Sequence, residues 1–480
     1  MKGRGGRGKS DRAQGGVDMG GVGSDRMGRR AAGLMLAAAM LFALLLGGLW
    51  ASGLRAADAP GGRAFVGVAS CAGSTCHGRM EGDGKVVRQD ELMRWQEPST
   101  PGGAHSRAFV VLSGTRGRQI AATLGLGDPT AAPACLGCHS TPAAATGARF
   151  LTSDGVGCEA CHGAAGGWIA SHYAVGASHA GNVAAGMIPM DRPQARAALC
   201  LDCHFGSDRP GQFVDHRIMA AGHPRISFEL DLFSSMQAHH DEDADYARRK
   251  GRTDSLKFWA VGQAMAVERA LILYAGAKGT EGAFPEFYFF DCQSCHRRIY
   301  DQAERSKTWE ANPGRPIPAG MPPFNDENMI LLSAAARVAA PELAGRFDAD
   351  SKAFHAAIAK DRRAAVAAAG KLAASARALG DAFAGGGVKG DMTFAIVREI
   401  AGGAIAPRFT DYEGSVQAVM AIDTLLNAMV KSGQVTVGAA AGIRADVNRA
   451  YAAVKEPNGY QPAAFRAALG SAARSIGALR

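Results

Sequence analysis

Large aromatic side chains are scarce in this sequence. Phe, Trp and Tyr make up 7% of the 480 residues, whereas Ala and Gly dominate many stretches. The hydrophobic fraction of 47% is that of an ordinary globular protein, and the length allows more than one domain. A core with so few large side chains needs other material to fill it.

The chain also lacks a stripe of basic residues interleaved with aromatic ones, although its formal net charge is +9. More than half of this charge lies in residues 1–30, which contain eight Lys/Arg against three Asp/Glu. This basic tail is rich in Gly and Arg, a composition typical of disordered segments. We therefore expect no nucleic-acid partner.

Charged residues are absent from 31–54, where the central run reads LMLAAAMLFALLLGGLW. Such a segment is long enough to span a bilayer as a helix, and its basic flank predicts that the N-terminus stays inside. A cleaved signal peptide with Ala56 and Ala57 at its cleavage site is the alternative. Both interpretations place the body of the chain on the periplasmic side of the cytoplasmic membrane, either anchored or soluble after cleavage.

No cysteine is left over for a disulfide, because all ten fall into five motifs that end in Cys-His. Four motifs have the C-x-x-C-H spacing and the first is widened to C-x4-C-H. The motifs are Cys71 and Cys76 with His77, Cys135 and Cys138 with His139, Cys158 and Cys161 with His162, Cys200 and Cys203 with His204, and Cys292 and Cys295 with His296.

This spacing is typical of covalent haem attachment. Two thiols add to the two vinyl groups of one porphyrin, and the histidine that follows becomes the proximal iron ligand. Zinc ribbons and redox dithiols also use C-x-x-C, but they do not require the trailing histidine. The sequence therefore predicts five covalent haem c groups, which also supply the missing core material. In the widened first motif we expect the loop to bulge.

Eight histidines remain after the proximal ones, and seven of them lie among the motifs. His216 and His223 are seven residues apart, so they would face the same side of a helix if this segment were helical. His239 and His240 are adjacent, and we expect only one to bind iron. His179 is expected to be exposed. Alternative sixth ligands are Met187, Met190 and Met219.

Several longer pieces of the chain resemble the cytochrome c-554 family of multihaem cytochromes. The similarity runs from Phe65 to about Phe324. It rests on the motif of 67–78, on Trp95 followed by 105–109, on 155–163 with Trp168 and His172, on 216–230, and on 284–288 leading into Cys292. The fifth motif, the widened first motif and a long helical tail are departures from the tetrahaem members.

The resemblance implies a mainly α, loop-rich core in which closely packed haems pass electrons along a chain. It also implies a set of distal iron ligands, which are His105, His172, His216, His223 and His239.

After the Pro-rich run of 313–325, a predicted linker, the sequence has no cysteine and one histidine. Ala-rich segments near 326–345, 349–380, 391–404, 411–432, 437–455 and 461–479 have helical apolar spacing. The predicted organisation is thus a pentahaem cytochrome domain at 60–312 and a C-terminal helical extension at 326–480. His355 is expected on a helix surface.

These features predict a periplasmic electron carrier that works between a redox donor and a redox acceptor. The alternative is a reductase of a small nitrogen or sulfur compound at one haem with an open coordination position. Charged residues that would line such a site are Glu159, Asp215, Arg225 and His240. No catalytic residue is predicted, since these groups do not form a convergent set and the chain has no C-x-x-C-K motif.

Overall fold

The computed structural model describes residues 64–82, 88–225, 227–280, 285–296, 314–318, 321–405 and 411–480. Residues 63–480 form one compact unit. The described residues contain helices and loops but no strand, and two isolated β-bridges join Phe65 to Thr146 and Phe290 to Phe324. The predicted mainly α, loop-rich fold with a C-terminal helical stretch is therefore confirmed.

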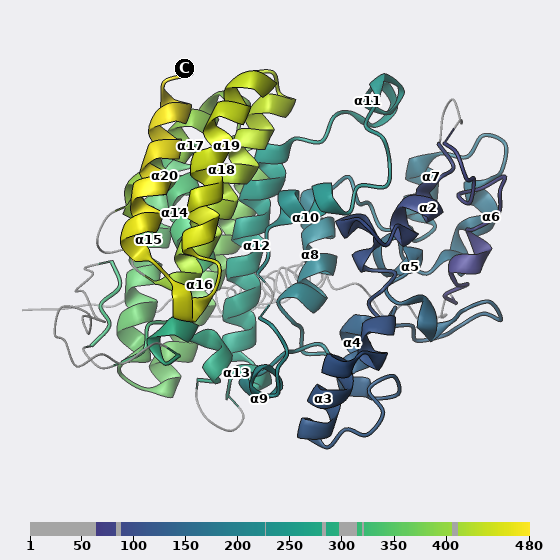
Figure 1. Cartoon of the computed structure of the whole chain (residues 1–480), viewed down its shortest axis with the longest axis horizontal. Coiled ribbons are helices and arrows are strands. Elements are labelled where there is room, and N and C mark those ends of the chain that lie inside the picture. Colours follow the sequence, from purple (N-terminus) through teal and green to yellow (C-terminus); the bar gives the residue numbers. More distant parts are fainter. Residues whose placement is uncertain are drawn as a thin grey trace, which may run out of the picture. The chain divides into compact units, whose positions relative to one another are not determined.

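The motif-bearing part consists of short helices joined by long loops (Figure 1). Most of these helices have fewer than eight residues, so the backbone offers little repetitive structure of its own. The helices are α2 (Glu91–Gln96), α3 (Thr115–Leu124), α4 (Pro133–His139), α5 (Cys158–His162), α6 (Ile169–His172), α7 (His179–Ala184), α8 (Pro193–His204), α9 (His216–Ala220), α10 (Leu230–Met236) and α11 (Ala244–Lys250).

Long helices make up most of the rest of the described chain and pack as a bundle, and the loop of the fifth motif lies between α13 and α14 in the sequence (Figure 1). They are α12 (Ser255–Ala275), α14 (Glu327–Ala339), α15 (Pro341–Ile358), α16 (Arg362–Ala382), α17 (Thr393–Ile405), α18 (Tyr412–Lys431), α19 (Val437–Ala453) and α20 (Pro462–Gly477), and the short α13 (Ala277–Thr280) follows α12.

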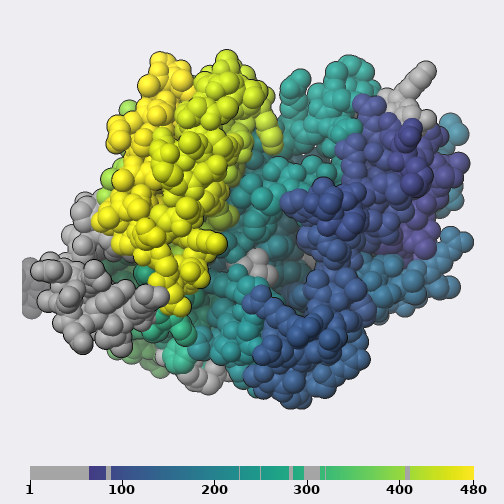
Figure 2. Space-filling view, in the orientation of Figure 1, coloured from purple at the N-terminus to yellow at the C-terminus, as the bar shows by residue number. Residues whose placement is uncertain are grey.

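Helix α12 joins the two parts of this unit. It is apolar on most sides, and Trp259 and Tyr274 are fully buried. One face packs against α16 and α14, and another packs against α8 and α10 of the motif-bearing part. In Figure 2 the teal surface from the middle of the chain accordingly lies between the blue and yellow surfaces. The hydrophobic core thus continues across the predicted linker, and the domain boundaries stay predictions.

The predicted C-terminal helices agree closely with α17 to α20, but the earlier ones were wrong in number. The segments 326–345 and 349–380 form three helices, α14, α15 and α16. Pro341 begins α15, because proline favours the first helical position. The Asp361 side chain accepts a hydrogen bond from the Ala364 amide and caps α16. Both residues are ordinary start signals inside an otherwise continuous Ala-rich pattern.

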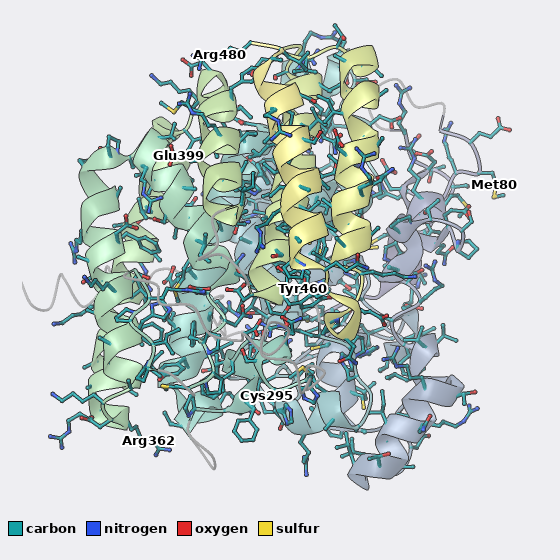
Figure 3. The ribbon with its side chains drawn as sticks, turned by 60° about the vertical axis from the view of Figure 1, so that its left-hand side comes forward. Met80, Cys295, Arg362, Glu399, Tyr460 and Arg480 are labelled. Carbon is teal, nitrogen blue, oxygen red and sulfur yellow. The ribbon has the colours of Figure 1, made fainter. Side chains whose placement is uncertain are left out.

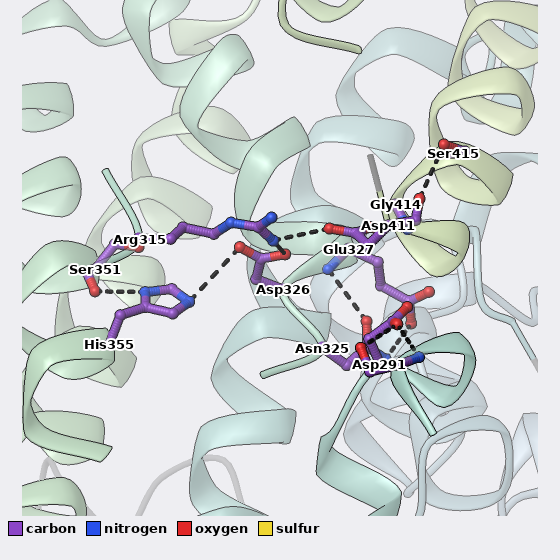
Figure 4. A network of polar contacts seen from close by, with 11 residues as sticks. Asp291, Arg315, Asn325, Asp326, Glu327, Ser351, His355, Asp411, Gly414 and Ser415 are labelled. Atoms are coloured by element: carbon purple, nitrogen blue, oxygen red, sulfur yellow. Dashed lines mark hydrogen bonds and ion pairs between the residues drawn. The ribbon is translucent and has the colours of Figure 1, made fainter. Parts of the chain in front are cut away.

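A polar network lies where the fifth motif meets the bundle (Figure 4). The Arg315 guanidinium donates to Asp326 at 2.7 Å and to Asp411 at 2.8 Å. Asp291, directly before Cys292, accepts from the Ser294 amide at 2.8 Å. The side-chain amide of Gln293 also donates to the Pro457 carbonyl of the bundle at 3.3 Å. Cys295 and Tyr460, which are labelled in Figure 3, mark this region. The bundle therefore supports the loop of the fifth motif.

The described residues include no helix that is both long enough and apolar enough to cross a membrane. The basic tail of 1–30 and the hydrophobic segment of 31–54 lie outside the described residues.

Candidate haem sites

Three of the five motifs form the last turn of a helix. Helices α4, α5 and α8 end on His139, His162 and His204, the last residue of their motifs. One helical turn places the two thiols of C-x-x-C on one side of the helix, and the histidine follows on the next turn. The fifth motif makes a 3-10 turn, η7 (Cys292–Ser294). These backbones present the cysteines in the arrangement that attachment to one porphyrin edge requires.

The widened first motif follows a 3-10 helix, η1 (Val68–Ser70). Its loop closes with a hydrogen bond from the Cys76 amide to the Gly73 carbonyl at 2.8 Å and another from the His77 amide to the Cys71 carbonyl at 3.2 Å. The extra residues thus form the expected bulge, while the Cys-His end keeps the order of the other motifs. None of the ten cysteines forms a disulfide.

Each predicted proximal histidine lies opposite a different predicted distal histidine. The ring centres are between 6.1 and 6.2 Å apart in all five pairs. We number the pairs by motif, and they are His77 with His172 (site one), His139 with His223 (site two), His162 with His239 (site three), His204 with His105 (site four), and His296 with His216 (site five).

This spacing fits an iron atom between the two rings. A metal–nitrogen bond to histidine is about 2 Å, and a ring nitrogen lies about 1.1 Å from the ring centre, so two rings on opposite sides of one iron have centres about 6.2 Å apart. Direct stacking would bring the rings closer, and unrelated rings would not repeat one distance five times. The histidine pairs therefore fit haem with two axial histidines.

Hydrogen bonds from Nδ1 to backbone carbonyls orient three of these rings. The Nδ1 atom of His139 lies 2.6 Å from the Ala108 carbonyl, and those of His223 and His239 lie 2.8 and 2.9 Å from backbone carbonyls. A carbonyl can only accept, so Nδ1 carries the proton and Nε2 keeps a lone pair for a metal. Burial lowers the pKa of His162 to about 3 and that of His239 to about 4, which favours the neutral ring that binds iron.

Site one differs because its proximal ring contacts a carboxylate. The Nδ1 atom of His77 lies 3.0 Å from Oε2 of Glu91, and Nδ1 of His240 lies 3.4 Å from Oε1 of the same side chain. Burial alone would raise the pKa of Glu91, but the hydrogen bonds with His240 and His77 outweigh it and hold that pKa well below its ordinary value. Glu91 was not found from the sequence, where a lone glutamate 14 residues after His77 carries no signal.

His240 lies close to site three as well. Its ring centre is 6.4 Å from that of His162 and 4.4 Å from that of His239, and the three rings form a group able to hold a metal ion. His239 is the more buried of the two neighbours and is anchored by a backbone carbonyl, as His139 and His223 are. These features favour His239 as the ligand of site three.

His216 and His223 do not share a helix face. Helix α9 ends at Ala220, and Gly222 has a φ of +112°, a conformation that favours glycine and turns the chain. His216 consequently faces His296 of site five, whereas His223 faces His139 of site two. The turn at Gly222 places the two sites at the two ends of one short segment.

The motifs also contact one another. The thiols of Cys71 and Cys158 lie close enough to interact, and so do those of Cys138 and Cys203. Cys161 is close enough to Cys203 for their charges to interact. These contacts join site one to site three, site three to site four, and site four to site two.

The charged residues considered for an enzyme site have structural partners instead. Glu159 accepts hydrogen bonds from the amides of Val66, Gly67 and Ala165 at 2.7 to 2.9 Å. Asp215 accepts from the Ile218 amide at 2.8 Å and caps α9. Arg225 is largely buried and pairs with Glu327 and Glu413.

Two other histidines lie outside the pairs. His179 is exposed, as expected, with its Nε2 atom 3.1 Å from Asp191. The expectation for His355 was wrong, because its side chain is buried. Its Nδ1 atom contacts the Ser351 carbonyl at 2.8 Å and its Nε2 atom lies 3.6 Å from Asp326. In an Ala-rich helix both faces look alike in sequence, so the buried side could not be identified.

Comparison with known proteins agrees with this chemistry. No curated protein and no solved structure matches the chain. Residues 70–163, which contain the first three motifs and His105, match the family model of cytochrome c554 and c-prime. The match indicates a c-type cytochrome with covalent haem c that acts in electron transfer with redox protein partners. Residues 70–163 of the chain are therefore similar to the cytochrome c554 family, which supports the resemblance seen in the sequence.

Proposed function

We propose that this protein is a periplasmic electron carrier with five covalent haems, each held between two histidines. The observation that carries the proposal is the common spacing of the five histidine pairs, with ring centres 6.1 to 6.2 Å apart. Haem, when bound, supplies the one-electron chemistry. The protein supplies the ten thiols that hold it, the ten imidazoles that fill both axial positions, and the surroundings that set each potential.

Two axial histidines suit transfer rather than catalysis. An enzyme that reduces a small molecule needs one iron with an open position and acid or base groups beside it. Each of the five proximal histidines has a partner ring opposite it, and Glu159, Asp215 and Arg225 are engaged in structural contacts. Both observations favour the carrier over the reductase.

The contacts between motifs support an order for the sites. Site one adjoins site three, site three adjoins site four, and site four adjoins site two through their cysteines. Site five follows site two, since His216 and His223 belong to one short segment. The proposed order is therefore one, three, four, two, five, with sites one and five at the ends, where redox partners would bind.

The haem count is tested by producing the chain in a host that attaches haem c and measuring the intact mass after denaturation. We expect five covalent haems, and four in the double variant Cys292→Ser/Cys295→Ser. A matched control is Ser294→Ala within the same motif, which should keep five. Loss of all haem on denaturation would refute covalent attachment, and an unchanged mass in the double variant would refute a fifth site.

Ligation is tested separately by low-temperature EPR of the oxidised protein. We expect low-spin signals that account for all the haem. An axial high-spin signal of one haem equivalent would instead favour the reductase.

A further inference from the structure

Glu91 places one carboxylate between two histidines. It is the first residue of α2 and its side chain is buried, with 7% exposed. Oxygen Oε2 lies 3.0 Å from Nδ1 of His77, and Oε1 lies 3.4 Å from Nδ1 of His240. The carboxylate thus contacts Nδ1 of the site-one proximal ring, which leaves Nε2 as the nitrogen available to iron.

This contact has no equivalent among the other anchored rings of the described chain. His139, His223 and His239 each place Nδ1 against a backbone carbonyl, which is a neutral acceptor. A carboxylate draws the Nδ1 proton more strongly, and hydrogen bonds with a charged partner are about twice as strong as neutral ones. The His77 ring therefore gains more negative character at its iron-binding nitrogen than the ligands of sites two and three.

The position of the carboxylate is fixed from several directions. The Leu92 amide donates to the His77 carbonyl at 2.9 Å, which holds the start of α2 against the motif. Arg94 donates to Asp241 at 2.6 Å and ties α2 to the segment that bears His239 and His240. These contacts hold the backbone of Glu91 beside the first motif.

We infer that Glu91 is a positioning residue that lowers the midpoint potential of the haem at site one below those at sites two and three. An axial ligand with more negative character stabilises ferric over ferrous iron, and hydrogen bonding behind an axial histidine is one of the ways a protein sets a haem potential. This inference rests on the proposed function, because it requires iron between His77 and His172.

The lower potential at site one predicts the direction of electron transfer among the haems. Site one is at one end of the proposed order, and electrons pass from low to high potential. Electrons therefore enter at site one and move toward site three, and the surface near α2 and the first motif is the donor side.

The test is a redox titration of the haem-loaded protein followed by EPR, in which the signal of site one is assigned as the one that is missing in the variant His172→Met. In Glu91→Gln, which keeps the shape and removes the charge, we expect the haem at site one to be reduced at a higher potential. This shift should exceed that of every other haem. The matched control is Asp243→Asn, which removes a nearby carboxylate that pairs with Arg88 and touches no predicted iron ligand.

A shift at site one no larger than in Asp243→Asn would overturn the inference. If Glu91→Gln does not accumulate, Glu91→Asp lengthens the contact with His77 but keeps the charge, and it should raise the same potential by less. An unchanged potential at site one in Glu91→Asp would also refute the inference. A wild-type protein with fewer than five low-spin haems would contradict the proposed function instead, so the two failures are distinguishable.

Discussion

The imidazole rings of His77 and His172 are nearly parallel, with an interplanar angle of 21° and centres 6.1 Å apart. His139 and His223 lie at the same spacing but at 89°. The relative orientation of two axial rings sets how strongly the iron d orbitals split. With iron bound between each pair of rings, the five proposed sites would differ in electronic structure even though their ligands are chemically alike.

We predict two classes of low-spin EPR signal from these angles. Nearly parallel rings give a rhombic signal, whereas nearly perpendicular rings give one with a large maximal g value. Sites one and five, at 21° and 33°, belong to the first class, and sites two, three and four, at 76° to 89°, belong to the second.

The variant His172→Met should remove one equivalent of the rhombic class and leave the second class unchanged. His179→Met is the control, since His179 is exposed and faces Asp191. Loss of intensity from the large-g class in His172→Met would contradict the assignment of site one.

A second prediction concerns the two neighbouring histidines of site three. His239→Gln should convert one haem to a high-spin form or to ligation by His240, because His239 is the more buried ring and its Nδ1 is held by Gln237. His240→Gln should leave all haems low-spin, since His240 is turned toward Glu91. Optical and EPR spectra of the two variants check this. A high-spin haem in His240→Gln, with all haems low-spin in His239→Gln, would identify His240 as the ligand.

Local chemistry explains how much of these sites could be predicted from the sequence. Thiol addition to one porphyrin fixes the spacing of cysteines and histidine, so the five motifs stand out without a structure. The partners of these histidines are set by long-range folding. His105 precedes the second motif but faces His204 of the fourth, and His216 faces His296 across 80 positions. No periodicity connects such residues.

The same distinction holds for the helices. Helices α17 to α20 were predicted because Ala-rich apolar spacing is a local property. The break at Pro341 was missed although proline is a local start signal, whereas the burial of His355 depends on neighbours from other helices. Glu91 was missed for the same reason, since its partner His240 lies far along the chain.

A third prediction is that the contribution of Glu229 to stability falls as the pH rises toward neutrality. Burial, together with the charge of Asp231, raises the pKa of Glu229 to about 7 from an ordinary 4.5. Between these values the folded protein holds a proton that the unfolded chain releases, so Glu229 contributes its stabilisation below pH 4.5 and loses it as the pH rises through 7. Its share of the unfolding free energy should fall by about 2 kcal/mol between pH 5 and pH 8.

Comparison of wild type with Glu229→Gln isolates this contribution, because the variant cannot release the proton. Denaturant titrations across this pH range should show the two proteins differing by an amount that changes with pH. The variant Glu81→Gln, which changes an exposed residue, is the control. A difference between wild type and Glu229→Gln that stays constant with pH would contradict the prediction.

The last prediction concerns the buried contact between the fifth motif and the bundle. The Arg225 guanidinium lies 3.6 Å from Glu327 and 3.8 Å from Glu413, and its Nη1 atom lies 3.5 Å from the Cys292 thiol. Its side chain is 12% exposed. Removing one member of a buried ion pair leaves its partners charged and unpaired, which costs about 3–5 kcal/mol. Arg225→Met should therefore destabilise the protein by that amount and reduce haem attachment at site five.

A double variant separates loss of the ion pair from loss of packing. Adding Glu327→Gln to Arg225→Met removes one of the two stranded carboxylates, so the double variant should recover part of the lost stability. The surface pair of Arg337 and Asp348 provides the control, because Arg337→Met should cost about 1 kcal/mol or less. If denaturant unfolding shows Arg225→Met to be no less stable than Arg337→Met, the guanidinium does not hold the bundle against the fifth motif, and the packing of η7 on the bundle must do so alone.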